Sequence, residues 1–385
     1  MDDRWLASSA VLAVLARIGL IVYATGMTRS KNAAGIVFRN IADVCVATLA
    51  VWLVGTALWS HSHSVIGFNR HDALGGSAVG LLLLITTLLP GTGAVAAAAG
   101  ERSRLLPLCA VSAVLAGVVM PVLLHWTTHR DGWLTRLGLV DATGAAGVHL
   151  AAAAVAAVFA SAVGARTGKY HRDGSTSLIP GHNLPLAGVG VLLALVGWLG
   201  YTHSPPTVLV TAAAGGFAAG VYGTIKFGKP DIVLTYSGLL GALFASTAAA
   251  GVGTRWGVVV GAIAGLGVAV LAVTLDMRMK LDDPTAAVAV HGGGAAIGLL
   301  LAPLFVSESL RQALARLGVA VLAIAVVTIV AGGTAWVLAK VLGGRARLRS
   351  SEADEYDGLD LAEHDVASYP DFQQNTIRSY HLREA

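Results

Sequence analysis

Long apolar runs separated by short polar connections make up most of this 385-residue chain. One helical crossing of a bilayer needs about 20 predominantly apolar residues. Runs of this kind predict spans at 6–27, 41–60, 73–99, 105–126, 142–164, 186–203, 206–224, 231–252, 256–275, 285–306 and 313–341. The pattern therefore predicts an all-α polytopic membrane protein with about eleven transmembrane helices.

The connections between these spans differ in their basic residues, and this difference predicts the orientation. Lysine and arginine concentrate in the cytoplasmic connections of membrane proteins. The richer set is Arg29, Lys31, Arg39, Arg102, Arg104, Arg166, Lys169, Arg172, Lys226, Lys229, Arg278 and Lys280, followed by Arg345, Arg347 and Arg349. The poorer set is Arg70, Arg130, Arg136, Arg255, Arg311 and Arg316. We therefore expect the N-terminus outside the cell and the C-terminus in the cytoplasm.

An odd number of spans in this orientation fits an internal repeat. Spans one to five, at about 6–164, pair with spans six to ten, at about 186–306, as inverted repeats. The last span, at about 313–341, stands outside them. Two similar segments support this pairing, because Gly-Val-His149-Leu-Ala-Ala in span five resembles Ala-Val-His291-Gly-Gly-Gly in span ten.

These two histidines are the first functional candidates. An ionisable group at bilayer depth is costly, so an intramembrane histidine is a functional hypothesis that needs a partner. Their matched positions make His149 and His291 partners of each other. Histidine titrates near neutrality, which suits a pair that holds or passes a proton. The alternative is that each ring only bonds a backbone carbonyl inside the bundle.

Asp141 precedes the first histidine by eight residues, which is about two helical turns or roughly 12 Å along the axis. This spacing places Asp141 near the outer mouth of the span that carries His149. Its carboxylate either attracts a cation toward the pore or caps the helix, and the sequence leaves both interpretations open.

Four further charged residues lie at or inside the spans. Asp282 and Asp283 precede Pro284 at the start of span ten, where acidic residues favour a helix N-terminus. Arg17 and Asp43 lie within spans one and two. The sequence does not decide whether they face the bundle or another subunit, or whether they pair.

The composition agrees with a membrane protein. The chain is 55% hydrophobic and 12% charged, with a mean hydropathy of +0.72, and soluble domains carry about twice that charge. Its 47 glycines suit helices that pack closely through small residues. Cys45 and Cys109 lie in apolar segments and imply no disulfide framework. The net charge of +4 follows from the basic connections and does not indicate nucleic-acid binding.

The sequence contains no complete enzyme motif. Residues 223–229, Gly-Thr-Ile-Lys-Phe-Gly-Lys, match the start of a phosphate-binding loop, but Pro230 stands where the metal-binding Ser or Thr belongs. Neither a dinucleotide fingerprint nor a metal-ligand cluster nor a nucleophile elbow is present. We therefore expect no enzymatic activity, no cofactor and no metal site. The first residues also lack the pattern of a signal peptide, so the first span is expected to be retained.

The end of the chain is acidic rather than apolar. Hydropathy falls from about residue 350, and the acidic residues there are Glu352, Asp354, Glu355, Asp357, Asp360, Glu363 and Asp365. We expect a membrane domain over 1–345 and a cytoplasmic tail over 346–385. The tail is either disordered or docked on the basic cytoplasmic connections.

Several of these segments together resemble the ammonium transporter (Amt/Mep/Rh) family. Gly-Met-Thr-Arg-Ser-Lys-Asn at 26–32 and Phe-Gly-Lys-Pro-Asp at 227–231 resemble two of its loops. The other matching segments are residues 39–43, 164–170, 179–186, 282–292 and 357–371. The resemblance runs nearly from end to end of the chain.

The resemblance implies a homotrimer in the inner (plasma) membrane, with a narrow hydrophobic pore in each subunit. The twin histidines of the family match His149 and His291, and its aspartate at the pore mouth matches Asp141. In the family's usual mechanism, ammonium is recruited at an outer vestibule and loses its proton, and the histidine pair acts as the relay. A PII-type nitrogen-regulatory protein is the implied partner, expected at the loop 165–182 and the tail.

The outer vestibule departs from the family pattern. The family uses a tryptophan within Trp-Val-Trp-Gly-Gly-Gly-Trp, whereas residues 126–133 here are Trp-Thr-Thr-His-Arg-Asp-Gly-Trp. This alignment keeps Trp126 and puts Thr128 at the cation–π position. The loss of such a contact removes roughly 0.5–2 kcal/mol of cation attraction, and Arg130 nearby adds a like charge.

The paired phenylalanine gate of the family is also altered. Leu83, counted back from Glu101, falls at one gate position. Tyr201, in the segment Trp-Leu-Gly-Tyr at 198–201, falls at the other. Recruitment and gating are therefore expected to differ from the family, whereas the histidine pair is retained.

Three functions remain open at this point. The first is ammonium/ammonia transport through a hydrophobic pore, and the second is an ammonium-binding sensor with little transport that signals through a separate partner. The third keeps the fold but carries methylamine, whose protonated form is methylammonium, or another small neutral gas. The sequence does not decide whether transport carries net charge.

Overall fold

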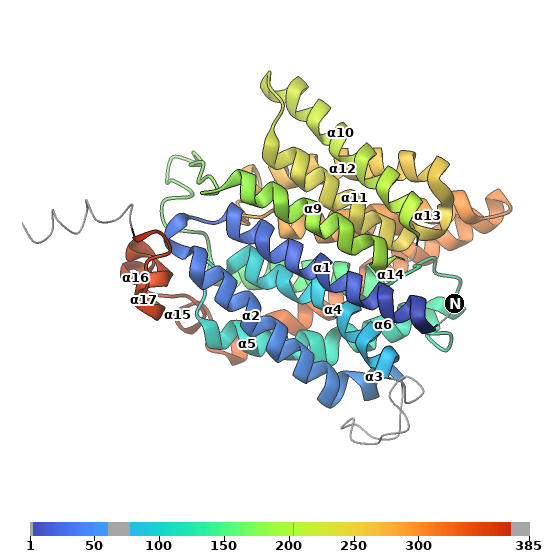
Figure 1. The fold of residues 1–385 in the computed structure, drawn as a ribbon, viewed down its shortest axis with the longest axis horizontal. Helices are drawn as coiled ribbons and strands as arrows, with labels where there is room; N and C mark the ends of the chain where they lie inside the picture. Colours follow the sequence, from blue (N-terminus) through green and yellow to red (C-terminus); the bar gives the residue numbers. More distant parts are fainter. Residues whose placement is uncertain (1–2, 61–77, 203, 371–385) are drawn as a thin grey trace, which may run out of the picture.

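The computed structural model describes residues 3–60, 78–202 and 204–370. Within these ranges the chain forms a bundle of long helices and contains no β-strand beyond two isolated bridges (Figure 1). Arg70, the first residues of the predicted third span and the tail beyond residue 370 lie outside the described residues.

The first half of the bundle follows the predicted spans. Its helices are α1 (Asp3–Met27), α2 (Ala33–Ala50), α3 (Thr56–Ser60), α4 (Ala78–Ala99), α5 (Leu105–Val114), α6 (Met120–Thr128), α7 (Trp133–Arg136) and α8 (Ala151–Val163). The π-helical segments Val51–Gly55 and Leu115–Val119 join α2 to α3 and α5 to α6. The second and fourth predicted spans are therefore each one continuous helical rod.

The second half repeats this pattern and adds one long helix. Its helices are α9 (Leu184–Tyr201), α10 (Pro205–Phe227), α11 (Ile232–Ala249), α12 (Gly253–Met277), α13 (Gly294–Val306) and α14 (Leu310–Val341). Residues 223–229, which match part of a phosphate-binding loop, only end α10 and lead into α11. The side chain of Asp231 accepts a hydrogen bond from the backbone N–H of Leu234 and caps α11.

The all-helical membrane architecture is confirmed. In the described ranges, ten helical stretches are long and apolar enough to cross a membrane. One of them, Ile232–Met277, contains two helices, α11 and α12, which pack against each other. Gly253 between them has a φ of 76°, which glycine adopts without steric cost. The exact number of crossings and the side on which each end lies stay predictions.

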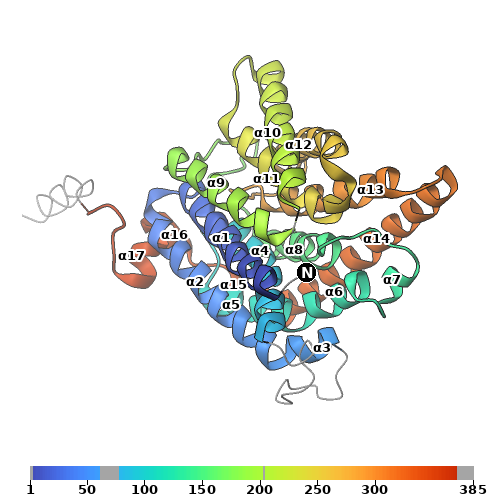
Figure 2. The same ribbon diagram turned by 45° about the vertical axis from the view of Figure 1, so that its right-hand side comes forward.

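The first helices of the two predicted repeats pack closely together. Glycines at the contact between α1 and α9 leave no room for a side chain, because a Cβ at Gly19 or Gly197 would overlap the backbone of the other helix. Small residues of this kind let membrane helices approach through their backbones. The contact brings Arg17 and Tyr23 of α1 toward the centre of the bundle, as Figure 2 shows for the two helices.

The tail docks on one end of the bundle, opposite the N-terminus (Figure 1). It forms three short helices, α15 (Arg345–Leu348), α16 (Glu352–Asp357) and α17 (Leu359–His364). The carboxylate of Asp360 accepts hydrogen bonds from the backbone N–H groups of Ala34 and Gly35, at 3.0 and 2.6 Å. The Arg39 guanidinium lies 2.7 Å from the Glu363 carboxylate. Of the two alternatives for the tail, docking is therefore the one observed up to residue 370.

A buried ionic network holds the connections together beneath the tail. Glu101 pairs with Arg29 and Arg166, both at 2.8 Å, and Arg166 also pairs with Asp282 at 2.8 Å. Burial opposes ionisation of Glu101, but Arg166 and Arg29 hold the pKa of that carboxyl below its ordinary value. Several of the connections that are rich in lysine and arginine therefore meet at the tail end of the bundle.

Candidate functional site

Two matched segments carry the predicted histidines into the centre of the bundle. His149 lies in the π-helical segment Ala145–Leu150, which continues as α8, and His291 lies in Val288–Gly293, which continues as α13. Such π-helical turns are rare and are frequent at functional sites. The residue five positions before each histidine has a left-handed backbone, Gly144 with a φ of 96° and Ala286 with a φ of 53°. The two halves therefore build the same local structure.

The structure brings the two histidines into direct contact. The Nδ1 atoms of His149 and His291 lie 3.3 Å apart, and the side chains are 0% and 4% exposed. At this distance one Nδ1 donates a proton and the other accepts it. The Nε2 atom of His149 is buried and has no hydrogen-bond partner within the described residues. Of the two sequence interpretations, the geometry favours the pair over separate bonds to backbone carbonyls.

Aromatic rings enclose this pair. Phe244 stacks on His149 with centroids 4.6 Å apart and lies 4.2 Å from His291. Trp198 and Tyr201 lie 5.4 and 5.8 Å from the His149 ring. These rings exclude water from the histidines and fix the orientation of their imidazoles.

Asp141 lies at the start of the first segment. Its carboxylate accepts hydrogen bonds from the backbone N–H groups of Gly144, Ala145 and Ala146, at 3.1, 2.7 and 2.9 Å. These are donors that a helix N-terminus otherwise leaves unsatisfied, and the negative charge suits the helix dipole. The capping interpretation of Asp141 is therefore confirmed. Attraction of a cation by the same carboxylate stays a prediction.

The second segment has a similar cap and an additional ion pair. Asp283 accepts a hydrogen bond from the backbone N–H of Val288 at 2.7 Å, as the sequence predicted for the start of span ten. Asp282 instead pairs with Arg166 and accepts its backbone N–H at 2.8 Å. Burial opposes ionisation, but the guanidinium groups of Arg102 and Arg166 lower the pKa of Asp282 to about 2. A capping role for Asp282 is therefore replaced by an ionic one.

Of the two predicted gate residues, Tyr201 lies beside a histidine, with its ring centroid 5.8 Å from that of His149. The Tyr201 ring stacks on Trp198, with centroids 4.9 Å apart, and its hydroxyl donates to the carbonyl of Thr87 in α4 at 3.0 Å. Leu83 is half-buried and lies one helical turn along α4 from Thr87. The contact of Tyr201 with α4 is therefore at Thr87, and the gate role of Leu83 stays a prediction.

The predicted vestibule residues lie at the end of α6. The hydroxyl of Thr128 donates to the carbonyl of Leu124 at 2.8 Å, within its own helix. Trp126 meets Trp133 edge to face, with centroids 6.0 Å apart. Arg130 is 89% exposed and lies 3.6 Å from the Asp131 carboxylate. The Thr128 hydroxyl therefore donates its proton within its own helix. Its role in recruiting a cation stays a prediction.

A buried ion pair stands beside the histidines. Arg17 of α1 lies 2.6 Å from the Asp43 carboxylate of α2, with the side chains 3% and 0% exposed. Thr92 also donates to Asp43, at 2.8 Å, and so does Ser112. The structure thereby resolves the alternatives left open for Arg17 and Asp43, because they pair with each other inside the bundle.

The described residues contain no cluster of three or more histidines, cysteines or carboxylates that could hold a metal ion. What the site offers instead is a pair of imidazoles in apolar surroundings at the meeting point of two similar half-chains. That arrangement suits the passage of a small, protonatable molecule.

Comparison with known proteins decides the family. The model of the Ammonium Transporter Family matches residues 4–369. This chain belongs to the ammonium transporter family. Ammonium transporter Amt1 of Haloferax mediterranei is 30% identical, over 96% of this chain and 79% of that protein. Ammonium transporter Amt2 of Archaeoglobus fulgidus is 28% identical, over 97% of this chain and 89% of that protein.

Solved structures agree with this assignment to the ammonium transporter family. A structure described as "Sensor Amt Protein" superimposes with a TM-score of 0.89 and is 26% identical. The match covers 94% of this chain and 98% of that one. The shared fold therefore extends over nearly the whole chain.

Sequence reasoning missed two parts of the site. Phe244 packs against both histidines, but a single phenylalanine in an apolar span gives no signal of its own. The ionic partners of Asp282 come from distant connections, so no local pattern reveals them. The intramembrane charges Arg17 and Asp43 did give a signal, although only the structure shows that they pair.

Proposed function

We propose that this protein transports ammonium and ammonia across the inner (plasma) membrane, with deprotonation of ammonium and the His149–His291 pair as the relay for the proton. One observation carries the proposal. The two imidazoles bond through their Nδ1 atoms, which leaves their Nε2 atoms for a guest molecule, and the Nε2 of His149 is buried without a partner in the described ranges.

The chemistry of the pair suits this task. When one Nδ1 donates to the other, the donor ring has an unprotonated Nε2 and the acceptor ring carries its proton on Nε2. The pair thus presents one acceptor and one donor, which fits the lone pair and the N–H groups of ammonia. Moving a bare ion through an apolar constriction costs several kcal/mol, and separating the proton from the neutral base lowers that cost.

Flux of ammonia into proteoliposomes, measured as the internal pH change after an ammonium pulse, tests the proposal. His149→Ala and His291→Ala should each abolish the protein-dependent signal. His182→Ala is the matched control, because its ring bonds Thr28 and Tyr369 at the tail end of the bundle. Unchanged flux in both pore variants would overturn the role of the pair.

A second candidate function is an ammonium sensor with little transport, which signals through a separate partner. It is favoured by the similarity to the structure described as "Sensor Amt Protein" and by the Tyr201 hydroxyl bonded to Thr87, which holds this ring beside His149. A wild-type protein without flux, whose thermal stability nevertheless rises with ammonium, would support the sensor over the transporter.

The assembly is part of the proposal. We infer a homotrimer and a membrane domain over 1–345 with a regulatory tail over 346–385. The loop 165–182 is the proposed contact for a PII-type protein, and its residues His171–Ser175 are exposed. Native mass spectrometry measures the subunit number directly, and a monomeric mass would contradict the trimer.

A further inference from the structure

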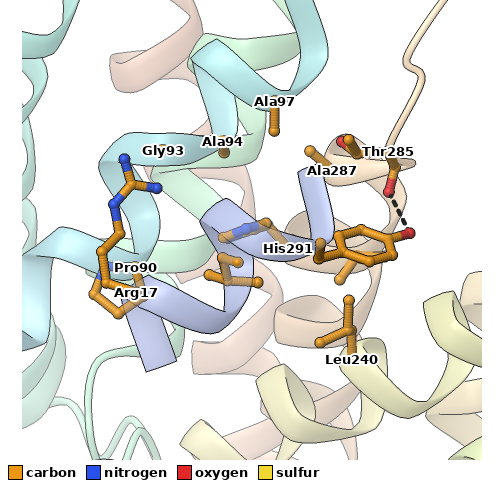
Figure 3. Close-up of a pocket in the computed structure, with 12 residues that line it drawn as sticks. Arg17, Pro90, Gly93, Ala94, Ala97, Leu240, Thr285, Ala287 and His291 are labelled. Carbon is orange, nitrogen blue, oxygen red and sulfur yellow. Dashed lines mark hydrogen bonds between the residues drawn. The ribbon is translucent and has the colours of Figure 1, made fainter. Parts of the chain in front are cut away.

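A small cavity lies beside His291 at the centre of the bundle. Its volume is about 20 Å³, which is room for about one water-sized molecule. Its lining includes His291, Arg17, Tyr23 and Leu240 but not Asp43. Figure 3 shows the Arg17 side chain extending past Pro90 to Gly93, and the His291 imidazole on the neighbouring segment.

The Arg17 guanidinium is fixed on the side of this cavity. Its Nη2 is bound to Asp43, and Asp43 is itself held by the hydroxyls of Thr92 and Ser112. Gly93 leaves space for the guanidinium, because a Cβ added there would overlap Nη1. The arginine therefore cannot swing out of the cavity wall without breaking a buried ion pair.

One donor of this fixed arginine is unused. The Nε–H of Arg17 is buried and meets no acceptor among the described residues. A buried N–H without a partner is costly, and such a group inside a protein calls for an explanation. A small hydrogen-bond acceptor bound at the guanidinium would satisfy it.

Resting on the proposed transport function, we propose that Arg17 is a specificity-determining residue that selects the neutral base, ammonia, at a subsite between its guanidinium and His291. Ammonia has one lone pair and accepts a hydrogen bond from a guanidinium N–H, while its own N–H groups donate to an imidazole nitrogen. Ammonium has no lone pair to offer, and the positive charge of Arg17 repels it. Asp43 neutralises the pair overall, but of the two residues only Arg17 lines the cavity.

The test uses proteoliposomes and a double variant that removes both charges without leaving one unpaired. In Arg17→Gln/Asp43→Asn the two neutral amides can still hydrogen-bond to each other. Ammonia flux should fall about tenfold, the scale of one hydrogen bond from a charged donor. K⁺, a cation of similar size that cannot lose a proton, should begin to leak.

Two further variants separate the charge from its position. Arg17→Lys keeps a cation but alters the donor geometry, so it should continue to exclude K⁺ while its ammonia flux falls. Gly93→Ala should displace the guanidinium and give the same loss of ammonia flux without removing any charge. Arg39→Gln/Glu363→Gln is the matched control, because it removes a buried arginine ion pair that does not line the cavity.

The outcomes are distinct for the two proposals. A folded Arg17→Gln/Asp43→Asn protein with wild-type ammonia flux and no K⁺ leak would overturn the Arg17 subsite and leave the histidine pore intact. If the wild type itself shows no flux, the proposed transport fails, and ammonium-dependent thermal stabilisation then decides the subsite.

Selection of the neutral base predicts that the apparent affinity for total ammonium rises about tenfold per pH unit in the wild type. The same pH dependence in Arg17→Gln/Asp43→Asn would overturn the proposal that Arg17 selects the neutral base.

Discussion

The two histidine segments have the same plan but different surroundings. Each has an aspartate eight residues before the histidine, a left-handed residue five before it, and a π-helical turn that carries the imidazole. His149 is packed among aromatic rings, whereas His291 borders a cavity that Arg17 also lines. The shared local structure therefore sets the geometry of the pair, and the neighbours make its two members chemically unequal.

The residue nine positions before each histidine shows the same inequality. In the first segment it is Val140, which packs against an apolar cluster. In the second segment it is Asp282, which joins Arg166 in the buried ionic network. Apolar packing thus holds one segment and ion pairs hold the other.

The largest expected effect is a loss of stability when the ion pair that holds the second histidine segment is broken. Asp282→Asn removes the carboxylate that Arg166 and Arg102 share and leaves Glu101 as the remaining ionic partner of Arg166. Breaking such a buried pair costs about 3–5 kcal/mol of unfolding free energy. Chemical or thermal unfolding in detergent measures the loss. Asp276→Asn is the control, because Asp276 is 36% exposed in its pair with Lys169 and should cost about 1 kcal/mol or less.

The same carboxylate predicts a pH dependence. The pKa of Asp282 is about 2 in the folded protein and 3.8 ordinarily, so the folded state binds its proton less readily. The stability that Asp282 contributes is therefore fully present above pH 3.8 and is lost as the pH falls through about 2. Stability of the Asp282→Asn variant that declines as steeply over this range as that of the wild type would contradict the assignment.

An intermediate effect on stability is expected from substitutions at the two left-handed residues, Gly144 and Ala286. Gly144→Ala places a Cβ on a left-handed backbone and against Leu124, and should cost about 1–2 kcal/mol. Ala286→Gly relieves the same backbone strain in the other segment, and should be neutral or stabilising by up to about 1 kcal/mol. Thermal unfolding of both variants shows whether each substitution lowers or raises the stability. Equal destabilisation would show that the two segments do not share this backbone requirement.

The smallest effect concerns the aromatic side of the pair. Tyr201→Phe removes the hydrogen bond to Thr87 and keeps the ring beside His149, at a cost of about 1 kcal/mol. The freed ring should move more readily and raise the ammonia flux several-fold. Tyr236→Phe is the control, since its hydroxyl contacts Leu184 at 3.4 Å, away from the histidines. A lower flux in Tyr201→Phe would contradict a gating role.

Much of the fold could be predicted from the sequence, because a bilayer imposes the length and apolarity of each helix. The histidines and Asp141 were predicted for a similar reason, since charged or ionisable groups in apolar spans stand out. The long apolar rods at 41–60 and 105–126 gave no sign of their π-helical turns. Those turns depend on packing between helices, which periodicity does not encode.

The chemical inequality of the two histidines could not be predicted. It arises from Arg17 on α1 beside His291 and Trp198 on α9 beside His149, which meet only in the folded bundle. The role predicted for Asp282 was wrong for the same reason. Its position at a helix start predicted a cap, but distant arginines offer a stronger interaction than the local backbone.

A double-variant comparison tests the central claim most directly, namely that His149 and His291 act as one unit. Ammonia flux is measured in proteoliposomes for the wild type, His149→Ala, His291→Ala and the double variant. Residues that act as a unit give strongly non-additive losses. Each single variant should lose the flux, and the double variant should be no worse than either. Losses that multiply, or a single variant that retains wild-type flux, would contradict it.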